Sequence, residues 1–331
     1  MSVSSSQSAP FTKRALVDEV SNAASQDAQT DLANLLPASY RTAEDDLTAP
    51  SPISEAVDAE LDLSRLTAVH DYLWLAGRPM PPRPLHQQLL LNRQIAVTEK
   101  LDLHLVWGHG RIFIKPLPRF LLEPRFWNEH LQCRPPAGAR QTCVCGGRRE
   151  RALGFLFSYA ALIANESDFH IAKDSRLLPP EVAWQAWRTV VGQVLTIVDV
   201  YQFIDPRFCY GELRLSRLNK IYYFWKTPLR GYVSRWNQYG SFFQDNITWL
   251  ASSTVYMAVV LTAMQVGLAT ELQANTAFRL ASSGFAVFSI LVPLIVLAMV
   301  ICALCYLVVY NWIATRRYLR QRLVRITGSK L

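Results

Sequence analysis

The sequence predicts a mainly α-helical protein with a small β element. We expect a disordered acidic leader over residues 1–58, an α+β globular region over 59–245, and a C-terminal two-helix transmembrane hairpin over 246–315 followed by a basic tail. Three observations support this prediction. The chain of 331 residues is half hydrophobic, its charge is strongly uneven along its length, and two long stretches near the C-terminus contain no charged side chain.

The leader differs from the remainder in composition and in charge. Up to Asp62 the chain holds eleven acidic and three basic residues, a net charge of −8. Because the whole chain has a net charge of +8, the residues after Asp62 have a net charge of +16. Ser, Ala, Asp and Thr dominate the leader, and so few apolar residues do not offset the entropy cost of ordering. A short helix over 16–36 is the alternative. The basic residues crowd around the uncharged stretches, which favours anionic lipid over nucleic acid as a partner.

The globular region begins near Leu61, where regularly spaced leucines start. Residues 78–84 contain four prolines and predict an extended connector, because proline removes amide donors and disfavours helix in its predecessor; a PxxP-type ligand is the alternative. Residues 94–98 and 111–115 are β-branched or aromatic and are bounded by turn residues, so we expect paired strands. Residues 133–151, rich in Pro, Gly and Arg, predict a loop or insertion.

Two shorter apolar segments, 152–164 and 190–198, are predicted to be helices of the globular region. Each is well under the roughly 20 residues that a bilayer crossing requires, and each runs directly into acidic residues. The second belongs to a longer predicted helix over 181–203, because Pro179 and Pro180 precede it.

The hairpin prediction depends on two uncharged stretches, 247–270 and 280–315. At a rise of about 1.5 Å per residue, a helix of the first length reaches roughly 36 Å, enough to cross with some tilt. We expect spans at about 248–270 and 285–310, with Pro293 allowing a kink or a tilt in the second. A buried helical pair of a soluble protein is the alternative.

Orientation follows from the positions of Lys and Arg, because translocation of these residues is disfavoured. Basic residues precede the first span and follow the second, whereas the connection between the spans has only Arg279. We therefore predict a membrane protein with both termini in the cytosol. The expected anchors at the cytosolic interface are two tryptophans and three arginines of the 316–331 tail: Trp249, Trp312, Arg316, Arg317 and Arg320.

Two patterns predict how the spans and their flanks make contacts. Ala263 and Gly267 form a small-xxx-small pair that lets helices approach closely, in the hairpin or in a homo-oligomer. Apolar residues recur at helical spacing among the basic residues of 214–225 and 319–326, which favours attachment to anionic lipid. A solvated face of a packed helix is the alternative for the earlier segment. Both spans lack Asp, Glu, Lys, Arg and His, which argues against an ion path.

The sequence predicts no catalytic, cofactor or metal site. His104 with His109, and His130 with Cys133, Cys143 and Cys145, do not have the spacing of a zinc site. Gly108-His109-Gly110 superficially resembles the histidine segment of subtilisins, but the chain contains no nucleophile motif of a serine hydrolase and no phosphate-binding glycine loop.

Three blocks of sequence carry a resemblance to a known family: residues 70–79 (HDYLWLAGRP), 111–122 (RIFIKPLPRFLL) and 210–222 (YGELRLSRLNKIY). These blocks resemble uncharacterised membrane proteins of filamentous fungi that share a domain of unknown function. The resemblance covers about Leu61 to the C-terminus and implies a globular region joined to a C-terminal hairpin. It supplies no catalytic residues, and the subtilisin-like protease label sometimes attached to such sequences has no support in these residues.

The leading hypothesis for function is a membrane-anchored, cytosol-facing binding or scaffolding module, with the lipid bilayer and either a protein partner or a second copy as partners. One alternative is an enzyme with a nonstandard site in the region 78–126, which requires a concave pocket with inward-facing titratable residues. The other alternative is an oligomeric pore or carrier.

Overall fold

The computed structural model describes residues 9–12, 14–16, 32–42, 46–132, 147–197, 199–226, 231–233, 239–269 and 275–328. The chain divides into two compact units, Met1–Val233 and Ser234–Leu331. The predicted boundary was 245/246. The second unit starts earlier because the helix that contains the first uncharged stretch already begins at Tyr239.

The first unit includes parts of the predicted disordered leader. Phe11, Ala15 and Leu16 are buried in the core, and the ring of Phe11 packs edge-on against Trp127 with the centroids 6.3 Å apart. These three apolar residues pack in the core, so the prediction of disorder is wrong for them. Residues 1–8, 13, 17–31 and 43–45 of the leader lie outside the described residues.

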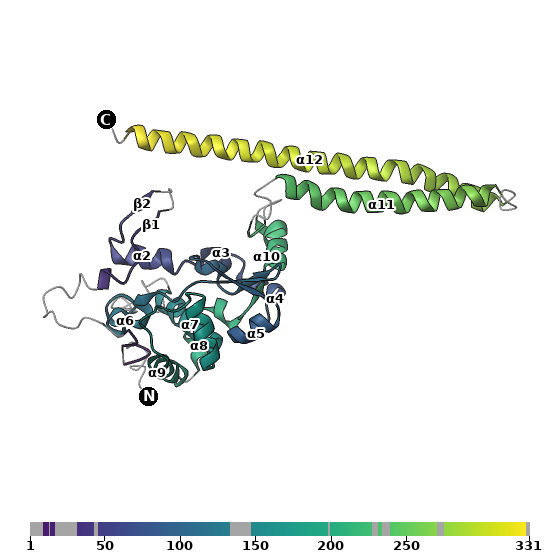
Figure 1. The fold of residues 1–331 in the computed structure, drawn as a ribbon. Coiled ribbons are helices and arrows are strands. Elements are labelled where there is room, and N and C mark those ends of the chain that lie inside the picture. Colours follow the sequence, from purple (N-terminus) through teal and green to yellow (C-terminus); the bar gives the residue numbers. More distant parts are fainter. Residues whose placement is uncertain are drawn as a thin grey trace. The chain divides into compact units, whose positions relative to one another are not determined.

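A two-stranded antiparallel pair and a series of short helices precede the main sheet (Figure 1). The leucines that marked the predicted start of the folded region, Leu63, Leu66 and Leu73, are fully buried within these helices or beside them. The elements are β1 (Tyr40–Arg41), β2 (Leu47–Thr48), α2 (Ile53–Glu60), α3 (Ser64–Thr67), η2 (His70–Tyr72), α4 (Leu73–Ala76) and α5 (Leu85–Leu90).

The main sheet has four strands in the order β3-β5-β4-β6. The predicted pairing of 94–98 with 111–115 is confirmed, since β3 and β5 lie parallel with Ile95 opposite Ile112. Strand β4, one of the two inner strands, is antiparallel to β5 and parallel to β6. Strands β4 and β6 were not predicted. They have only three and two residues, too few to show the apolar–polar alternation by which a strand is recognised in a sequence. The strands are β3 (Gln94–Val97), β4 (Val106–Gly108), β5 (Arg111–Ile114) and β6 (Leu213–Arg214).

The Gly108-His109-Gly110 segment is the hairpin turn between β4 and β5. Gly108 pairs with Arg111, which leaves His109 and Gly110 as a two-residue loop with φ of 51° and 69°. Two consecutive positive φ values are the requirement of a type I′ turn, whose twist matches that of the flanking strands. The glycine beside the histidine therefore serves the turn, and the resemblance to a protease histidine segment has a conformational explanation.

Helices α6 to α9 build most of the remaining core (Figure 1). The predicted helix at 152–164 is α7, in which ten of 15 residues are buried; a helix apolar on most sides is expected at the centre of a core. Residues 133–146 lie outside the described residues, and the predicted loop ends before 151 because α7 begins at Arg148. These elements are η3 (Leu101–Leu103), η4 (Arg119–Leu122), α6 (Pro124–His130), α7 (Arg148–Leu162), α8 (Glu166–Asp174), α9 (Trp184–Leu195), η5 (Val200–Gln202) and η6 (Pro206–Cys209).

Helix α9 is shorter at both ends than the predicted helix over 181–203. At its N-terminal side Val182 forms an isolated antiparallel bridge with Leu16. At its C-terminal side Asp199 has a φ of 53°. An extended residue before the helix and a left-handed residue after it are incompatible with continuous α-helix. Sequence periodicity does not reveal either conformation.

Helix α10 (Leu215–Ile221) corrects the prediction of a lipid-facing apolar stripe at 214–225. Leu215, Leu218 and Ile221 are buried in the core of the first unit, so the packed-helix alternative is the correct one here. The following π-helical turn η7 (Tyr222–Lys226) differs, because the side chain of Phe224 is 71% exposed and that of Trp225 is 54% exposed.

The second unit contains two long helices that contact each other, α11 (Tyr239–Leu268) and α12 (Thr276–Gly328). Both are long and apolar enough to cross a membrane by length and composition. Pro293 lies inside α12 without ending it. The predicted second span and most of the basic tail belong to this one helix.

Candidate functional site

A basic cavity of about 270 Å³ lies in the first unit. Its charged lining, which we call the arginine pocket, consists of five arginines and one glutamate: Arg78, Arg83, Arg93, Glu212, Arg214 and Arg217. Trp107 of β4 also lines the pocket. Three of the charged residues, Glu212, Arg214 and Arg217, lie outside the predicted alternative site at 78–126, because β6 and α10 bring the distant sequence 212–217 to it.

The predicted proline-rich connector forms one wall of the pocket through Arg78, Met80, Pro81 and Arg83. Its position is fixed by Gly211, whose amide donates a hydrogen bond of 2.8 Å to the Met80 carbonyl. A Cβ atom at position 211 would lie 2.4 Å from that carbonyl oxygen, closer than real Cβ atoms approach. The absent side chain therefore lets the connector lie directly against the segment that carries Glu212.

Glu212 organises the floor of the pocket. Its carboxylate accepts hydrogen bonds from Gln88 at 2.8 Å, from Arg93 at 2.6 Å, and from both the backbone amide and the guanidinium of Arg83 at 3.1 and 3.2 Å. Burial raises the pKa of Glu212, but the hydrogen bonds from Arg93, Gln88 and Arg83 together outweigh burial and hold the pKa below its ordinary value. The carboxylate is thus charged and fully engaged.

Arg93 is the most deeply buried arginine of the pocket. Its Nη1 donates to Gln88 Oε1 at 2.8 Å as well as to Glu212, and its guanidinium lies 4.0 Å from the centroid of the Trp107 ring. The guanidinium of Arg214 lies over the same ring at 5.3 Å. A planar guanidinium is able to stack on an indole ring while it donates hydrogen bonds in its own plane. The Trp107 ring therefore stabilises two of the five positive charges by cation–π contacts.

The other side of the pocket is rich in positive charge without matching carboxylates. Within the part of the chain that the structure describes, no Asp or Glu lies within ion-pair distance of Arg78, Arg214 or Arg217. Arg217 donates to the carbonyl of Leu75 at 3.0 Å, which fixes its direction. Five arginines against one glutamate leave four positive charges around a small volume, an arrangement that attracts anions.

A histidine and a serine that are 54 residues apart in the chain form a contact in the core, which no motif in the sequence predicts. His104 Nε2 lies 2.9 Å from Ser158 Oγ, while His104 Nδ1 accepts a hydrogen bond of 3.1 Å from the Lys115 amide. Since Nδ1 is an acceptor, Nε2 carries the proton and donates to the serine, whose hydroxyl donates in turn to the Phe155 carbonyl at 2.6 Å.

This direction is the reverse of a hydrolase dyad, in which the histidine accepts the proton of the nucleophile. Burial, followed by the charges of Arg207 and Lys115, lowers the pKa of His104 well below its ordinary value, so the ring stays neutral. Both His104 and Ser158 are buried. The pair is a structural contact in the core.

A buried cation beside this pair, Lys115 of the segment after β5, also has a structural role. Its ammonium group donates to Glu60 Oε2 at 2.6 Å and also to the backbone carbonyl of Glu99. The Lys115 carbonyl accepts a hydrogen bond of 2.6 Å from the Tyr159 hydroxyl. A buried ammonium is tolerated only when it is paired in this way.

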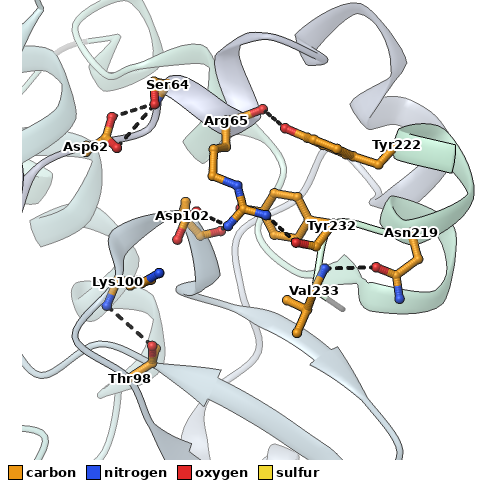
Figure 2. A network of polar contacts seen from close by, with 10 residues as sticks. All are labelled: Asp62, Ser64, Arg65, Thr98, Lys100, Asp102, Asn219, Tyr222, Tyr232 and Val233. Atoms are coloured by element: carbon orange, nitrogen blue, oxygen red, sulfur yellow. Dashed lines mark hydrogen bonds and ion pairs between the residues drawn. The ribbon is translucent and has the colours of Figure 1, made fainter. Parts of the chain in front are cut away.

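A third network surrounds Arg65 of α3 and fastens the last residues of the first unit (Figure 2). Its guanidinium donates to Asp102 Oδ2 at 2.8 Å and to the Tyr232 carbonyl, and it lies 4.1 Å from the centroid of the Tyr232 ring. The Tyr232 hydroxyl donates to the Asp102 carbonyl at 2.8 Å. The neighbouring amide of Val233 donates to Asn219 Oδ1 at 3.1 Å. These contacts hold residues 232 and 233 against the core.

The residues considered for a metal site are not brought together where the structure describes them. His104 is buried and hydrogen-bonded, and His109 is exposed in the β4–β5 turn. His130 lies on α6, whereas Cys133, Cys143 and Cys145 lie outside the described residues. Among the described residues, no group of three or more His, Cys, Asp or Glu side chains has the geometry to hold a metal ion.

The predicted interface anchors and packing residues all lie on the two long helices. Trp312, Arg316, Arg317 and Arg320 are exposed on α12, where the guanidinium of Arg316 lies 4.7 Å from the centroid of the Trp312 ring. Trp249 lies on α11, as do Ala263 and Gly267, which follow the same face of that helix at a spacing of four residues. Their predicted contacts with lipid or with a second helix stay predictions.

Comparison with known proteins assigns a family and no activity. No curated protein and no solved structure matches the chain. One family model matches residues 53–293, which is more than half of the chain and includes the whole arginine pocket, α11 and the start of α12. Its description states no function. The chain therefore belongs to the family of unknown function DUF6601.

Proposed function

We propose that the protein is a membrane-anchored binding module, in which α11 and α12 cross a bilayer as a hairpin and the first unit binds an anionic ligand in the arginine pocket. The single observation that carries this proposal is the arginine pocket itself, a cavity with a surplus of positive charge in a folded unit that precedes two membrane-length apolar helices in the chain.

Exposure of apolar side chains supports the membrane anchor. In α11 the side chain of Tyr256 is 70% exposed, and in α12 that of Leu280 is 75% exposed, with many other large apolar residues beside them on both helices. A soluble helical pair would bury such a surface, since contiguous exposed apolar area of this extent marks an interface with protein or lipid. The length of both helices and the long uncharged stretches that they contain favour lipid.

The distribution of basic residues supports an orientation with both termini in the cytosol. The tail of α12 carries Arg316, Arg317 and Arg320, whereas the only Lys or Arg between the two uncharged stretches is Arg279, near the start of α12. In this orientation Trp249 and Trp312 lie at the same, cytosolic interface, where amphipathic aromatic side chains are favoured. The arginine pocket would then face the cytosol.

The lining of the pocket favours binding over catalysis. Among the described residues that line it, no His, Cys, Ser, Lys or Tyr is present, and the carboxylate of Glu212 is occupied by its donors. General acid–base or nucleophilic catalysis requires a group that is able to exchange a proton or attack a substrate. An enzyme remains the second candidate, because a concave site does exist in and around the region 78–126. The oligomeric pore or carrier stays a prediction without a structural observation in its favour.

The anchor is tested by alkaline carbonate extraction of membranes that contain the full chain with a C-terminal tag, combined with protease protection of that tag. We expect the chain to stay in the membrane pellet and the tag to be digested in sealed vesicles of cytosol-out orientation. The matched variant I290K/L294K, with two charges in α12, should shift into the carbonate supernatant. Release of the unaltered chain by carbonate would contradict the proposal.

A partner or second copy is tested by purification in mild detergent at defined protein concentration. Ala263→Leu and Gly267→Leu place bulk on the small-residue face of α11 and should reduce self-association if that face packs against a second copy. Cosolubilised tagged and untagged chains report self-association directly. Recovery of a monomer at all concentrations would remove the homo-oligomer from the proposal.

A further inference from the structure

We infer that the arginine pocket recognises a phosphate monoester, presented either by a lipid headgroup or by a soluble phosphorylated molecule. This inference rests on the proposed function, because it names the ligand class of the same site. It follows from the choice of cation, from the preorganisation of the pocket, from its size, and from the aromatic side chains beside it.

All five cationic residues of the lining are arginines. The guanidinium group offers a planar fork of donors that binds an oxyanion through two parallel hydrogen bonds, which a lysine ammonium does not do. Arg78 comes from the connector, Arg214 from β6 and Arg217 from α10, so three separate elements direct donors to one volume. A dianionic phosphate matches this surplus of charge better than a single carboxylate does.

The pocket is organised before any ligand binds. Arg93 is held by Gln88, Glu212 and the Trp107 ring, and Arg217 is held by the Leu75 carbonyl. Fixed donors do not lose conformational freedom on binding, which raises affinity. The same rigidity keeps like charges close together, so an anion between them relieves repulsion in the folded state.

The size and the ring contacts narrow the ligand further. A cavity of about 270 Å³ is at the lower end of the volumes typical of small-molecule sites. The Trp107 ring already carries the guanidinium groups of Arg93 and Arg214, so it is not available for stacking with a nucleobase. A phosphate on a small, non-aromatic group such as a sugar or cyclitol fits these conditions.

Exposed aromatic side chains close to the pocket explain why a lipid headgroup is one of the two sources. Ala76 and Gly77 of the pocket wall lie two and three residues after Trp74, whose side chain is 62% exposed on α4. Helix α10, which carries Arg217, contacts α4 and continues into the exposed Phe224 of η7. Amphipathic aromatic residues are favoured at the headgroup level of a bilayer, where they would bring the pocket to a phosphorylated lipid.

The test uses the full chain in lipid nanodiscs. In the soluble arm, nanodiscs of phosphatidylcholine are titrated with inositol 1,4,5-trisphosphate, with inorganic phosphate, and with citrate as a carboxylate whose charge lies between those of the two phosphate ligands, and binding is measured by calorimetry. In the lipid arm, nanodiscs that contain phosphatidylinositol 4-phosphate are compared with nanodiscs of equal charge made with phosphatidylserine, and the melting temperature of the first unit is measured.

We expect binding of a phosphate ligand in one arm, at least tenfold weaker binding of citrate, and a loss of at least tenfold in affinity for the variant R78Q/R214Q. The matched control is R176Q/R188Q, which removes the same charge from exposed arginines outside the pocket. If R78Q/R214Q does not fold, R78K/R214K keeps the charge and removes only the bidentate geometry, and it should also weaken binding.

Binding only in the soluble arm assigns a soluble phosphate, and stabilisation only by the phosphoinositide assigns a lipid headgroup. The inference is overturned by absence of phosphate binding in both arms, by equal affinity for citrate, or by an equal loss in both double variants. These outcomes are independent of the carbonate extraction. If the chain resists carbonate extraction but does not bind phosphate, only the phosphate-ligand inference is overturned. If the chain binds phosphate but is released by carbonate, only the membrane-anchor proposal is overturned.

Discussion

Arg93 and Glu212 lie 119 residues apart in the chain and form an ion pair with 2.6 Å between Nη1 and Oε2. The pair joins the beginning of the sheet at β3 to the segment before its last strand, β6. Because Arg93 is buried, its charge depends on this partner for compensation. The same contact that shapes the arginine pocket thus contributes to the stability of the first unit.

Replacement of Glu212 by alanine should be strongly destabilising. It leaves Arg93 buried without a carboxylate, and removal of one partner from a buried ion pair typically costs about 3–5 kcal/mol. Thermal unfolding of the detergent-solubilised chain, followed by near-UV circular dichroism, measures the loss. Asp174→Ala removes an exposed carboxylate at the end of α8 and is the control. Equal melting temperatures for the two variants would contradict the structural role of Glu212.

The neutral, buried His104 should make the first unit less stable in mild acid. Its pKa is lowered in the folded state, first by burial, so the unfolded chain takes up a proton below about pH 6.5 while the folded chain does not. Stability attributed to this group is complete above pH 6.5 and falls as the pH decreases toward the folded-state pKa. Melting temperatures between pH 7.5 and 5 should fall less steeply for His104→Gln than for the unaltered chain. Parallel curves would show that His104 does not cause the decline.

Ser158 should be unreactive. Its hydroxyl donates to the Phe155 carbonyl and its oxygen accepts a hydrogen bond from His104 Nε2, so it lacks a base. We expect no labelling of the folded chain by a fluorophosphonate probe. Ser158→Ala should lower the free energy of unfolding by about 1–3 kcal/mol, because it leaves a buried histidine donor unpaired. Stoichiometric labelling that disappears in this variant would restore the hydrolase hypothesis.

The β4–β5 turn makes opposite predictions for two adjacent residues. Gly110→Ala forces a side chain into a left-handed conformation at φ of 69° and should destabilise by about 1–2 kcal/mol. His109→Asn should be neutral or slightly stabilising, since asparagine tolerates this conformation well. Thermal unfolding of both variants tests the assignment. A large loss for His109→Asn would indicate a role for the imidazole beyond the turn.

The Arg65 network should control the local stability of residues 232 and 233. Arg65→Ala removes the donors to Asp102 and to the Tyr232 carbonyl, so the amide of Val233 should exchange with solvent faster, by about tenfold for a local loss of about 1.4 kcal/mol. Hydrogen exchange with mass spectrometry reads this out. Arg111→Ala, an exposed arginine of β5, should leave the exchange unchanged. Unchanged exchange in Arg65→Ala would contradict the role of the network.

The longer helices and strands were predictable, because they have a periodic apolar pattern or a long uncharged sequence. The helix at 152–164, the paired strands at 94–98 and 111–115, and the two apolar helices follow from side-chain pattern and length. Short elements were not predictable in this way. Strand β6 has two residues, and the end of α9 depends on a left-handed Asp199, so neither leaves a periodic signal.

The site was less predictable than the fold. The proline connector was identified as an extended loop, but its partner Glu212 lies far along the chain and only the tertiary fold brings the two together. The stripe of Leu215, Leu218 and Ile221 was recognised in the sequence, but its environment was predicted wrongly. An apolar helical face packs equally well on lipid or on a protein core. Sequence alone does not distinguish these two solvents for a short amphipathic helix.

Gly211 offers a marker for comparing members of the family. No L-amino acid with a side chain fits at this position while the connector keeps its place, since a Cβ would lie 2.5 Å from the Pro82 nitrogen. A relative with any larger residue there must hold its proline segment elsewhere and cannot share the same cavity. Relatives that keep glycine at this position together with the arginines are therefore the ones to choose for ligand screening.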